Sequence, residues 1–259
     1  MKIIKKCAVL CAAAGCALAL VGCGGHGLVL GGKYTYDNAS RYLAGNGSFD
    51  AASVRELSVE WIAGDVILRE GEGDSITFTE TTTETDENYL LHYSLDGGDL
   101  KIRFQNSGTK IKSNFSKSLV IEYPAGHSFG EVEIDTASAR VDVSGITARE
   151  LDVDTASGGV SLGCKSVNDV NVDTASGKID IHGAFSKAEC DSASGSVTLT
   201  FPQDVGFSVK FKSASGKVNN STAATQQGKS YVLGNGQVLV EVDTASGSLT
   251  LKQEPLVTD

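Results

Sequence analysis

The chain has 259 residues and a hydrophobic content of 41%, with 30 glycines against 3 prolines. This composition excludes a disordered chain and supplies enough apolar residues for one large domain. The formal net charge of -10 argues against nucleic acid or an anionic lipid surface as the main partner.

Residues 1–22 have the pattern of a bacterial export signal. Lysines at positions 2, 5 and 6 precede an apolar run over 8–21, which is too short to span a bilayer comfortably. The run ends in Leu20-Val21-Gly22-Cys23, which resembles the lipobox of bacterial lipoproteins. The resemblance implies cleavage before Cys23, a lipid on its thiol, and a location on the extracytoplasmic face of the cell membrane. An uncleaved or ordinarily cleaved signal is the alternative.

The cysteines that remain after such processing do not form a disulfide framework. Cleavage would remove Cys7, Cys11 and Cys16, and lipidation would use Cys23, which leaves Cys164 and Cys190 in the body. These two are either buried free thiols or bonded partners on adjoining coils, and the sequence leaves both open.

The next segments predict a tether, a cap and an irregular first part of a repeat. Residues 23–53 begin glycine-rich and then carry Tyr34, Tyr36, Tyr42 and Phe49, which we expect to cap the first coil. In 54–130 a degenerate repeat keeps one set of intervals twice, as Leu57, Val59, Gly64, Val66, Leu68 and as Leu91, Tyr93, Gly98, Leu100, Ile102. The polar stretches 79–88 and 105–118 are expected to be projecting loops or strands of low apolar content.

Residues 131–253 carry a regular repeat, and 254–259 form a polar tail. The unit is a pair of alternating apolar residues, then Asp-Thr-Ala-Ser-Gly or a variant of it, then a second alternating pair. The motif serines lie 19, 19, 18, 21 and 31 residues apart, at Ser138, Ser157, Ser176, Ser194, Ser215 and Ser246. Period-two alternation predicts two short strands per repeat, with Ile146, Val167 and Phe185 as candidates for a third side. A unit of this length cannot bury its apolar face alone, so the repeat predicts an all-β solenoid, right-handed by default, in which coils stack about 4.8 Å apart.

Alternation also predicts which motif side chains face inward. We expect Thr and Ser of each motif to point into the solenoid, and Asp and Ala to point outward. The motif glycines are expected at corners that need a positive φ, and Ala139 in the first copy should then be relaxed or mildly strained. Around residues 231–239 an Asn-Gly turn between apolar runs predicts a hairpin or an extra corner.

The outward aspartates form the clearest candidate site, a possible acidic stripe on the outer face made of Asp135, Asp154, Asp173, Asp191 and Asp243. Like charges one coil apart repel, so this row fits either a calcium-binding stripe or a solvated acidic face offset by Lys178 and Lys217. The histidines at positions 26, 92, 127 and 182 lack metal-ligand spacing, and no histidine is paired with a motif serine. We therefore expect no catalytic residues, no metal site and no cofactor.

The lipobox, the segment 42–49, the stretch Trp61-Ile62-Ala63-Gly64 and the repeated motif together resemble a bacterial putative adhesin family with β-strand repeats, a domain of unknown function. The resemblance spans most of 40–253 and implies a binding protein without catalytic residues. Our leading hypothesis is a lipid-anchored scaffold on the cell surface that binds a surface protein or a glycan. A polymerising or stress-sensing envelope protein that associates through its coil ends, and a polysaccharide-acting β-helix enzyme, are the alternatives.

Overall fold

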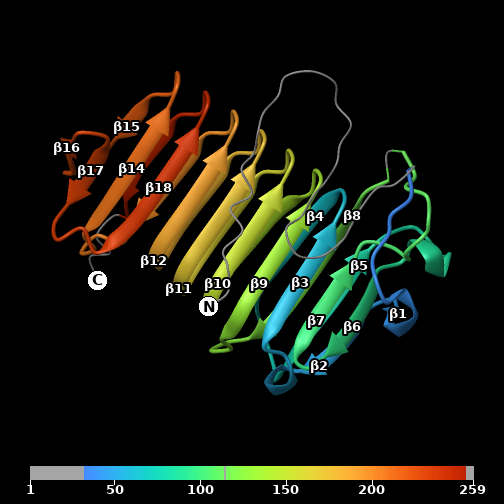
Figure 1. The fold of residues 1–259 in the computed structure, drawn as a ribbon. Helices are drawn as coiled ribbons and strands as arrows, with labels where there is room; N and C mark the ends of the chain where they lie inside the picture. Colours follow the sequence, from blue (N-terminus) through green and yellow to red (C-terminus); the bar gives the residue numbers. More distant parts are fainter. Residues whose placement is uncertain (1–31, 114, 255–259) are drawn as a thin grey trace.

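The computed structural model describes residues 32–113 and 115–254, and it is built almost entirely of β-strands (Figure 1). The signal segment, Cys23, the start of the tether and residues 255–259 lie outside the described residues. Within the described ranges the helices are short 3-10 turns, and none has the length and hydropathy needed to cross a membrane. The elements in chain order are η1 (Ala39–Arg41), β1 (Leu43–Ala44), β2 (Gly47–Asp50), η2 (Ala51–Ser53), β3 (Glu56–Trp61), β4 (Gly64–Gly71), β5 (Ser75–Thr81), η3 (Glu87–Tyr89), β6 (His92–Asp96), β7 (Asp99–Arg103), β8 (Lys117–Pro124), β9 (Phe129–Thr136), β10 (Arg140–Thr155), β11 (Val160–Thr174), β12 (Ile179–Ser192), β13 (Val197–Phe201), β14 (Phe207–Ser213), β15 (Val218–Asn220), β16 (Thr225–Gln227), β17 (Ser230–Leu233), β18 (Val238–Thr244) and β19 (Leu249–Gln253).

The strands form two sheets that enclose one apolar core. Sheet A has the order β1-β6-β7-β3-β9-β10-β11-β12-β18-β14-β17-β16, using the later halves of β10, β11 and β12. Sheet B has the order β2-β5-β8-β4-β10-β11-β12-β13-β19-β15, using the earlier halves of the same three strands. The predicted all-β solenoid is confirmed.

Each regular coil has two sides rather than three. The candidates for a third side are buried within the long strands, Ile146 in β10, Val167 in β11 and Phe185 in β12. The pairing register shifts beside Ile146 and before Val167, where these strands pass from sheet B to sheet A. A bulge of this kind bends a strand without ending it, so the chain turns the corner and continues into the other sheet.

The order of coils differs from the order of the sequence at both ends (Figure 1). The last coil, β18 with β19, lies between β12 with β13 on one side and β14 with β15 on the other. At the other end, β3 with β4 lies between β7 with β8 and β9 with β10. The stacking is therefore not sequential, because neighbouring motifs offer nearly identical edges.

One expected repeat and the segment predicted as a hairpin or an extra corner both contain antiparallel strands. The second degenerate unit forms the hairpin β6–β7, because Gly97 (φ 60°) and Gly98 (φ 93°) make a tight turn that reverses the chain. Near the C-terminus, β17 runs antiparallel to β14, and the chain then turns at Gly234 and Gly236 to place β18 on the other side of β14. The segment 231–239 thus arches over a strand instead of forming a hairpin.

The polar stretches divide between strands and loops. The first is strand up to Thr81 in β5, which pairs antiparallel with β8, and the second is mostly loop until β8 begins at Lys117. The expected cap residues Tyr34 and Tyr36 are buried, and Tyr42 and Phe49 pack against the core.

The motif corner explains the Asp-Thr-Ala-Ser-Gly sequence. Thr155 is buried as expected, and its hydroxyl accepts a hydrogen bond from the Gly158 amide at 2.9 Å and another from the Thr136 hydroxyl at 2.9 Å. The same threonine or serine to glycine bond recurs in the later corners. Buried amides need such partners, so the hydroxyl residue is required at this position.

The expectation that the motif serines point inward is wrong. The serine of every motif is exposed, and some of these hydroxyls bond a carbonyl of the neighbouring coil, as Ser138 does with Ile62 at 3.2 Å. The chain begins to turn directly after the buried Thr, so the period-two alternation of a strand no longer applies to the following residues.

The expectation of a positive φ at the motif glycines is also wrong. None of them is among the positive-φ residues, and Ala139 at the first corner is fully buried without backbone strain. A Cβ built on Gly158 would lie 1.8 Å from the Ala139 carbonyl oxygen, and one on Gly177 would lie 2.0 Å from that of Gly158. Glycine is needed because successive corners stack backbone on backbone.

Candidate functional site

The outward face of sheet A carries the predicted aspartate row. Asp135, Asp154, Asp173, Asp191 and Asp243 pair directly with one another in the parallel ladders of β9, β10, β11, β12 and β18. All five are half-buried. A second row lies beside the first and consists of Glu133, Asp152, Asn171, Glu189 and Glu241. We call these two rows the acidic face.

Cations close the aspartate row at both ends. At the N-terminal end of the row, Asp135 pairs with Glu60 of β3, and Glu60 pairs with Arg103 of β7. At the other end, Asp243 pairs with Lys212 of β14. Lys212 contacts Glu241 and lies 2.9 Å from the Asp243 carboxylate. Lys178 and Lys217, which sequence reasoning assigned to this role, lie instead past the corner, next to strands of sheet B.

The middle of the row has no such neutralisation, and its carboxyl groups hold protons unusually tightly. Burial, followed by the neighbouring carboxylates, raises the pKa of Asp135 to about 8 and that of Asp173 to about 7. In the second row, burial is again the main cause that raises the pKa of Glu133 to about 7 and that of Asp152 to about 6. The acidic face is therefore partly protonated near neutral pH.

The acidic face is a grid of separate carboxylates. Among residues 32–113 and 115–254, no three side chains of His, Cys, Asp or Glu converge closely enough to hold a metal ion. Neighbouring strands lie about 4.8 Å apart, so adjacent carboxylates form a flat array rather than a cage. This arrangement suits contact with a broad, positively charged surface.

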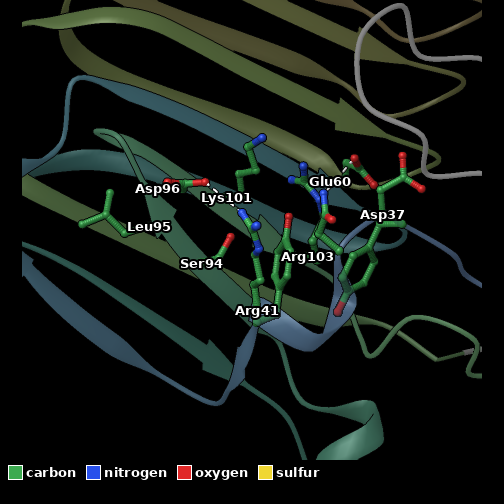
Figure 2. A pocket seen from close by; sticks show the side chains of 11 residues that line it. Asp37, Arg41, Glu60, Ser94, Leu95, Asp96, Lys101 and Arg103 are labelled. Atoms are coloured by element: carbon green, nitrogen blue, oxygen red, sulfur yellow. Dashed lines mark hydrogen bonds and ion pairs between the residues drawn. The ribbon is translucent and has the colours of Figure 1, made fainter.

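A pocket that sequence reasoning missed lies at the N-terminal end of sheet A (Figure 2). The segment 36–42 covers the outward side of β3, β6 and β7 and leaves a cavity of about 400 Å³. It is lined by Tyr36, Asp37, Asn38, Arg41, Tyr42, Glu60, Ser94, Leu95, Asp96, Lys101 and Arg103. We call it the cap pocket.

Ion pairs hold most of the charged groups of the cap pocket. Figure 2 shows Arg41 meeting Asp96 on one side, at 3.3 Å, and Arg103 meeting Glu60 on the other, at 3.2 Å. Arg103 is buried, and burial is the largest single effect and lowers its pKa, but Glu60 and the further acidic groups around it together raise the pKa more, so the guanidinium stays charged. Its Nη1 also donates to the Ser58 carbonyl oxygen at 3.1 Å.

The aromatic side of the cap pocket is formed by two tyrosines. The rings of Tyr36 and Tyr42 lie 4.6 Å apart between centroids. Asn38, which begins the turn η1, has a φ of 57° and is the one non-glycine residue with positive φ in the described part of the chain. The tyrosine-rich segment before the repeat was the only sequence feature that could have indicated this pocket. It was not sufficient, because the other wall of the pocket is formed by β6 and β7, which are distant in sequence.

The remaining candidates do not form a site. His92, His127 and His182 lie far apart in the fold, and His26 is outside the described residues. Cys164 and Cys190 are buried free thiols, and burial raises the pKa of Cys164 to about 12. A thiol that stays protonated and buried is unreactive, so neither cysteine acts as a nucleophile in this environment.

Stacked parallel coils with repeated hydroxyl corners define the class of protein as a β-solenoid built from strand repeats. A family model described as Toastrack DUF4097 matches residues 54–187 and 126–252, and the chain belongs to this family. The predicted resemblance to a family of strand-repeat domains of unknown function is thereby confirmed.

Solved structures with a similar fold come from several bacteria. A putative cell adhesion protein from Clostridium sporogenes ATCC 15579 is 17% identical, with a TM-score of 0.49 over 81% of this chain and 100% of that one. A putative adhesin from Bacteroides fragilis NCTC 9343 is 12% identical, with a TM-score of 0.42 over 82% and 97%. A putative lipid binding protein from Parabacteroides distasonis ATCC 8503 is 17% identical, with a TM-score of 0.34 over 80% and 95%. No curated protein matches the chain.

Proposed function

We propose that this protein is a non-catalytic binding scaffold on the outer side of the cell membrane, anchored by a lipid on Cys23. The observation that carries the proposal is the continuous outward face of sheet A. There, parallel ladders hold seven neighbouring strands in fixed register, in the order β3, β9, β10, β11, β12, β18 and β14. Such a face is rigid and flat, and it ends in the cap pocket. The proposal therefore places binding on sheet A and gives sheet B a supporting role.

The charge of the face determines the kind of partner. Part of the row is protonated near neutral pH, so its negative charge is fully developed only above about pH 8, where the carboxylates repel anionic lipid and nucleic acid and attract basic protein surfaces. We therefore propose a surface protein with a basic patch as the partner of the acidic face, with binding that weakens as salt increases.

Two variants of the full chain test this function. Beads coated with the protein should attach to bacterial envelope preparations at low salt and pH 9, where the row is ionised, and the combined change Asp135→Asn, Asp154→Asn and Asp173→Asn should reduce attachment at least tenfold. Asp142→Asn with Asp180→Asn on the outward face of sheet B is the matched control and should leave attachment unchanged. Equal attachment of all three proteins would overturn the assignment of sheet A.

The anchor and the absence of catalysis are tested separately. Cys23→Ser should move the protein from the membrane fraction to the soluble fraction, and a variant that stays in the membrane would contradict lipid anchoring. Incubation with envelope polysaccharides should release no new reducing ends. Release of reducing ends that depends on residues of the cap pocket would show that the protein is an enzyme and would overturn the proposal of a non-catalytic scaffold.

The coil ends give little support to a polymerising function. The outermost strands are β1 and β16 in sheet A and β2 and β15 in sheet B, and each has two to four residues. Very short edge strands are a common protection against edge-to-edge association. A stable monomer at high protein concentration in light scattering is the expected result.

A further inference from the structure

The cap pocket has the size of a small-molecule site. Ligand sites in proteins enclose about 300–1,000 Å³, and this cavity of about 400 Å³ lies at the small end of that range. One wall is the segment 36–42, and the other is the outward side of β3, β6 and β7 (Figure 2). Only a ligand of one or two rings would fit inside it.

The charges that line the cap pocket are balanced, which distinguishes it from the acidic face. Its cations are Arg41, Lys101 and Arg103, and its anions are Asp37, Glu60 and Asp96. The Arg41–Asp96 and Arg103–Glu60 pairs lie inside the lining, and Lys101 is 3.1 Å from Asp99 beside it. A site with paired charges does not select a strongly charged ligand, because an added ion would have to displace an existing partner.

The same residues offer hydrogen-bond donors and acceptors next to aromatic rings. Guanidinium groups donate, carboxylates accept, and Asn38 and Ser94 can do both. Tyr36 and Tyr42 add apolar ring surface with hydroxyl groups at the edge.

A buried hydroxyl in the lining lacks a partner. Tyr36 is only 7% exposed, and within the described residues no group forms a hydrogen bond with its hydroxyl oxygen in acceptable geometry. Burial raises the pKa of Tyr36 to about 12, although the nearby Ser107 amide acts to lower it. The Tyr36 hydroxyl oxygen has almost no accessible surface, so it lies out of reach of a ligand in the cavity, and hydrogen bonds to a ligand must come from the other lining residues.

We propose that the cap pocket binds one neutral sugar unit of a glycan. A sugar ring has an apolar face that packs on an aromatic ring, and its hydroxyls both donate and accept hydrogen bonds without carrying charge. This inference rests on the proposed binding function and adds a ligand class to it. The acidic face would then contact a protein surface while the cap pocket holds a sugar.

Titration calorimetry on the full chain tests the proposal. The protein is purified from membranes in a zwitterionic detergent without a sugar headgroup, and it is titrated with cellotetraose, chitotetraose, mannotetraose and the acidic tetragalacturonate. At least one neutral oligosaccharide should bind, and tetragalacturonate should bind more weakly. Binding of tetragalacturonate alone, or of none of the four, would overturn the proposal.

Three variants locate the binding. Arg41→Ala should weaken binding of the neutral oligosaccharide at least tenfold, whereas Arg69→Ala, in an exposed ion pair with Glu122 on sheet B, should not. Tyr36→Phe removes only the inaccessible hydroxyl and should leave the affinity unchanged. Unchanged affinity in Arg41→Ala, or equal losses in Arg41→Ala and Arg69→Ala, would refute the cap pocket as the sugar site.

The bead assay separates this inference from the function beneath it. If attachment still depends on the acidic face but no neutral sugar binds, the assignment of a sugar to the cap pocket is wrong and the proposed function as a binding scaffold still holds. If attachment is also independent of the acidic face, both are wrong.

Discussion

The proton affinity of the aspartate row leads to an unusual prediction, that removing a charge from Asp173 stabilises the protein at alkaline pH. Asp173 pairs with Asp154 on one side and Asp191 on the other. At a strand spacing of about 4.8 Å, each neighbour repels it by about 0.9 kcal/mol in water and by about 3.5 kcal/mol at an effective dielectric constant of about 20. The side chain is partly exposed and salt screens the charges, so we expect Asp173→Asn to gain about 1–2 kcal/mol at pH 8.

The sign of the pH dependence follows from the raised pKa. Burial and the neighbouring carboxylates raise the pKa of Asp173 from 3.8 to about 7 in the folded state. The folded protein therefore binds this proton more tightly than the unfolded chain, and the associated stability is complete below pH 3.8 and lost as the pH rises to about 7. Asparagine cannot ionise, so the benefit of the substitution should appear in full at pH 8 and fall to less than half of that value at pH 5.

Urea and thermal unfolding of the wild-type and variant proteins at both pH values measure this effect. For a domain of this size, about 1 kcal/mol corresponds to about 2–4 °C in the melting temperature. Asp142→Asn on sheet B is the control and should be neutral or slightly destabilising, because Asp142 pairs with Arg140 at 2.7 Å. A destabilised Asp173→Asn protein at pH 8, or an equal gain at both pH values, would refute the reasoning.

Three substitutions, two of them with a control at a neighbouring residue, test the interior and the corners. Their cost is the loss in free energy of unfolding, measured by thermal or urea unfolding. Val172→Asp places an unpaired charge in the core and should cost about 3–5 kcal/mol; a cost below 1 kcal/mol would mean that this side chain does not face inward. Gly158→Ala puts a Cβ 1.8 Å from the carbonyl oxygen of the preceding corner and should cost more than about 2 kcal/mol, whereas the adjacent Gly159→Ala, with its nearest atom at 4.0 Å, should cost less than about 1 kcal/mol. Thr155→Val leaves the buried glycine amide without its acceptor and should cost about 1–3 kcal/mol, while the exposed Ser157→Ala should change stability by less than about 0.5 kcal/mol; the reverse order would contradict the corner geometry.

The sequence was sufficient to predict the parts of the fold that depend on local periodicity. Alternation placed Val153 and Thr155 inside and Asp154 outside, and the near-constant period predicted that Asp154 would lie beside Asp135 and Asp173. These features need only a strand and a neighbour of the same sequence, so they follow without knowledge of distant contacts.

Other features depend on information that no single repeat contains. Alternation fails at the corner, so Ser157 faces solvent although the rule for strands places it inside. The coil containing β18 could pair with any coil of the same motif, and only the long interval before Ser246 indicates that the chain returns to an earlier position. The cap pocket requires Tyr42 and Arg103 to meet across a long separation in sequence, and the charge of each residue alone does not indicate that contact.

The insertion of the last coil has a consequence for the order in which the protein folds. A chain synthesised from its N-terminus makes β14 and β15 available before β18 and β19. The edges of β12 and β13 therefore stay unpaired, or pair temporarily with the wrong strand, until residues 238–253 are available to pair with them. Folding thus ends with a closing step in which the part of the chain that is synthesised last inserts between two parts that were synthesised earlier.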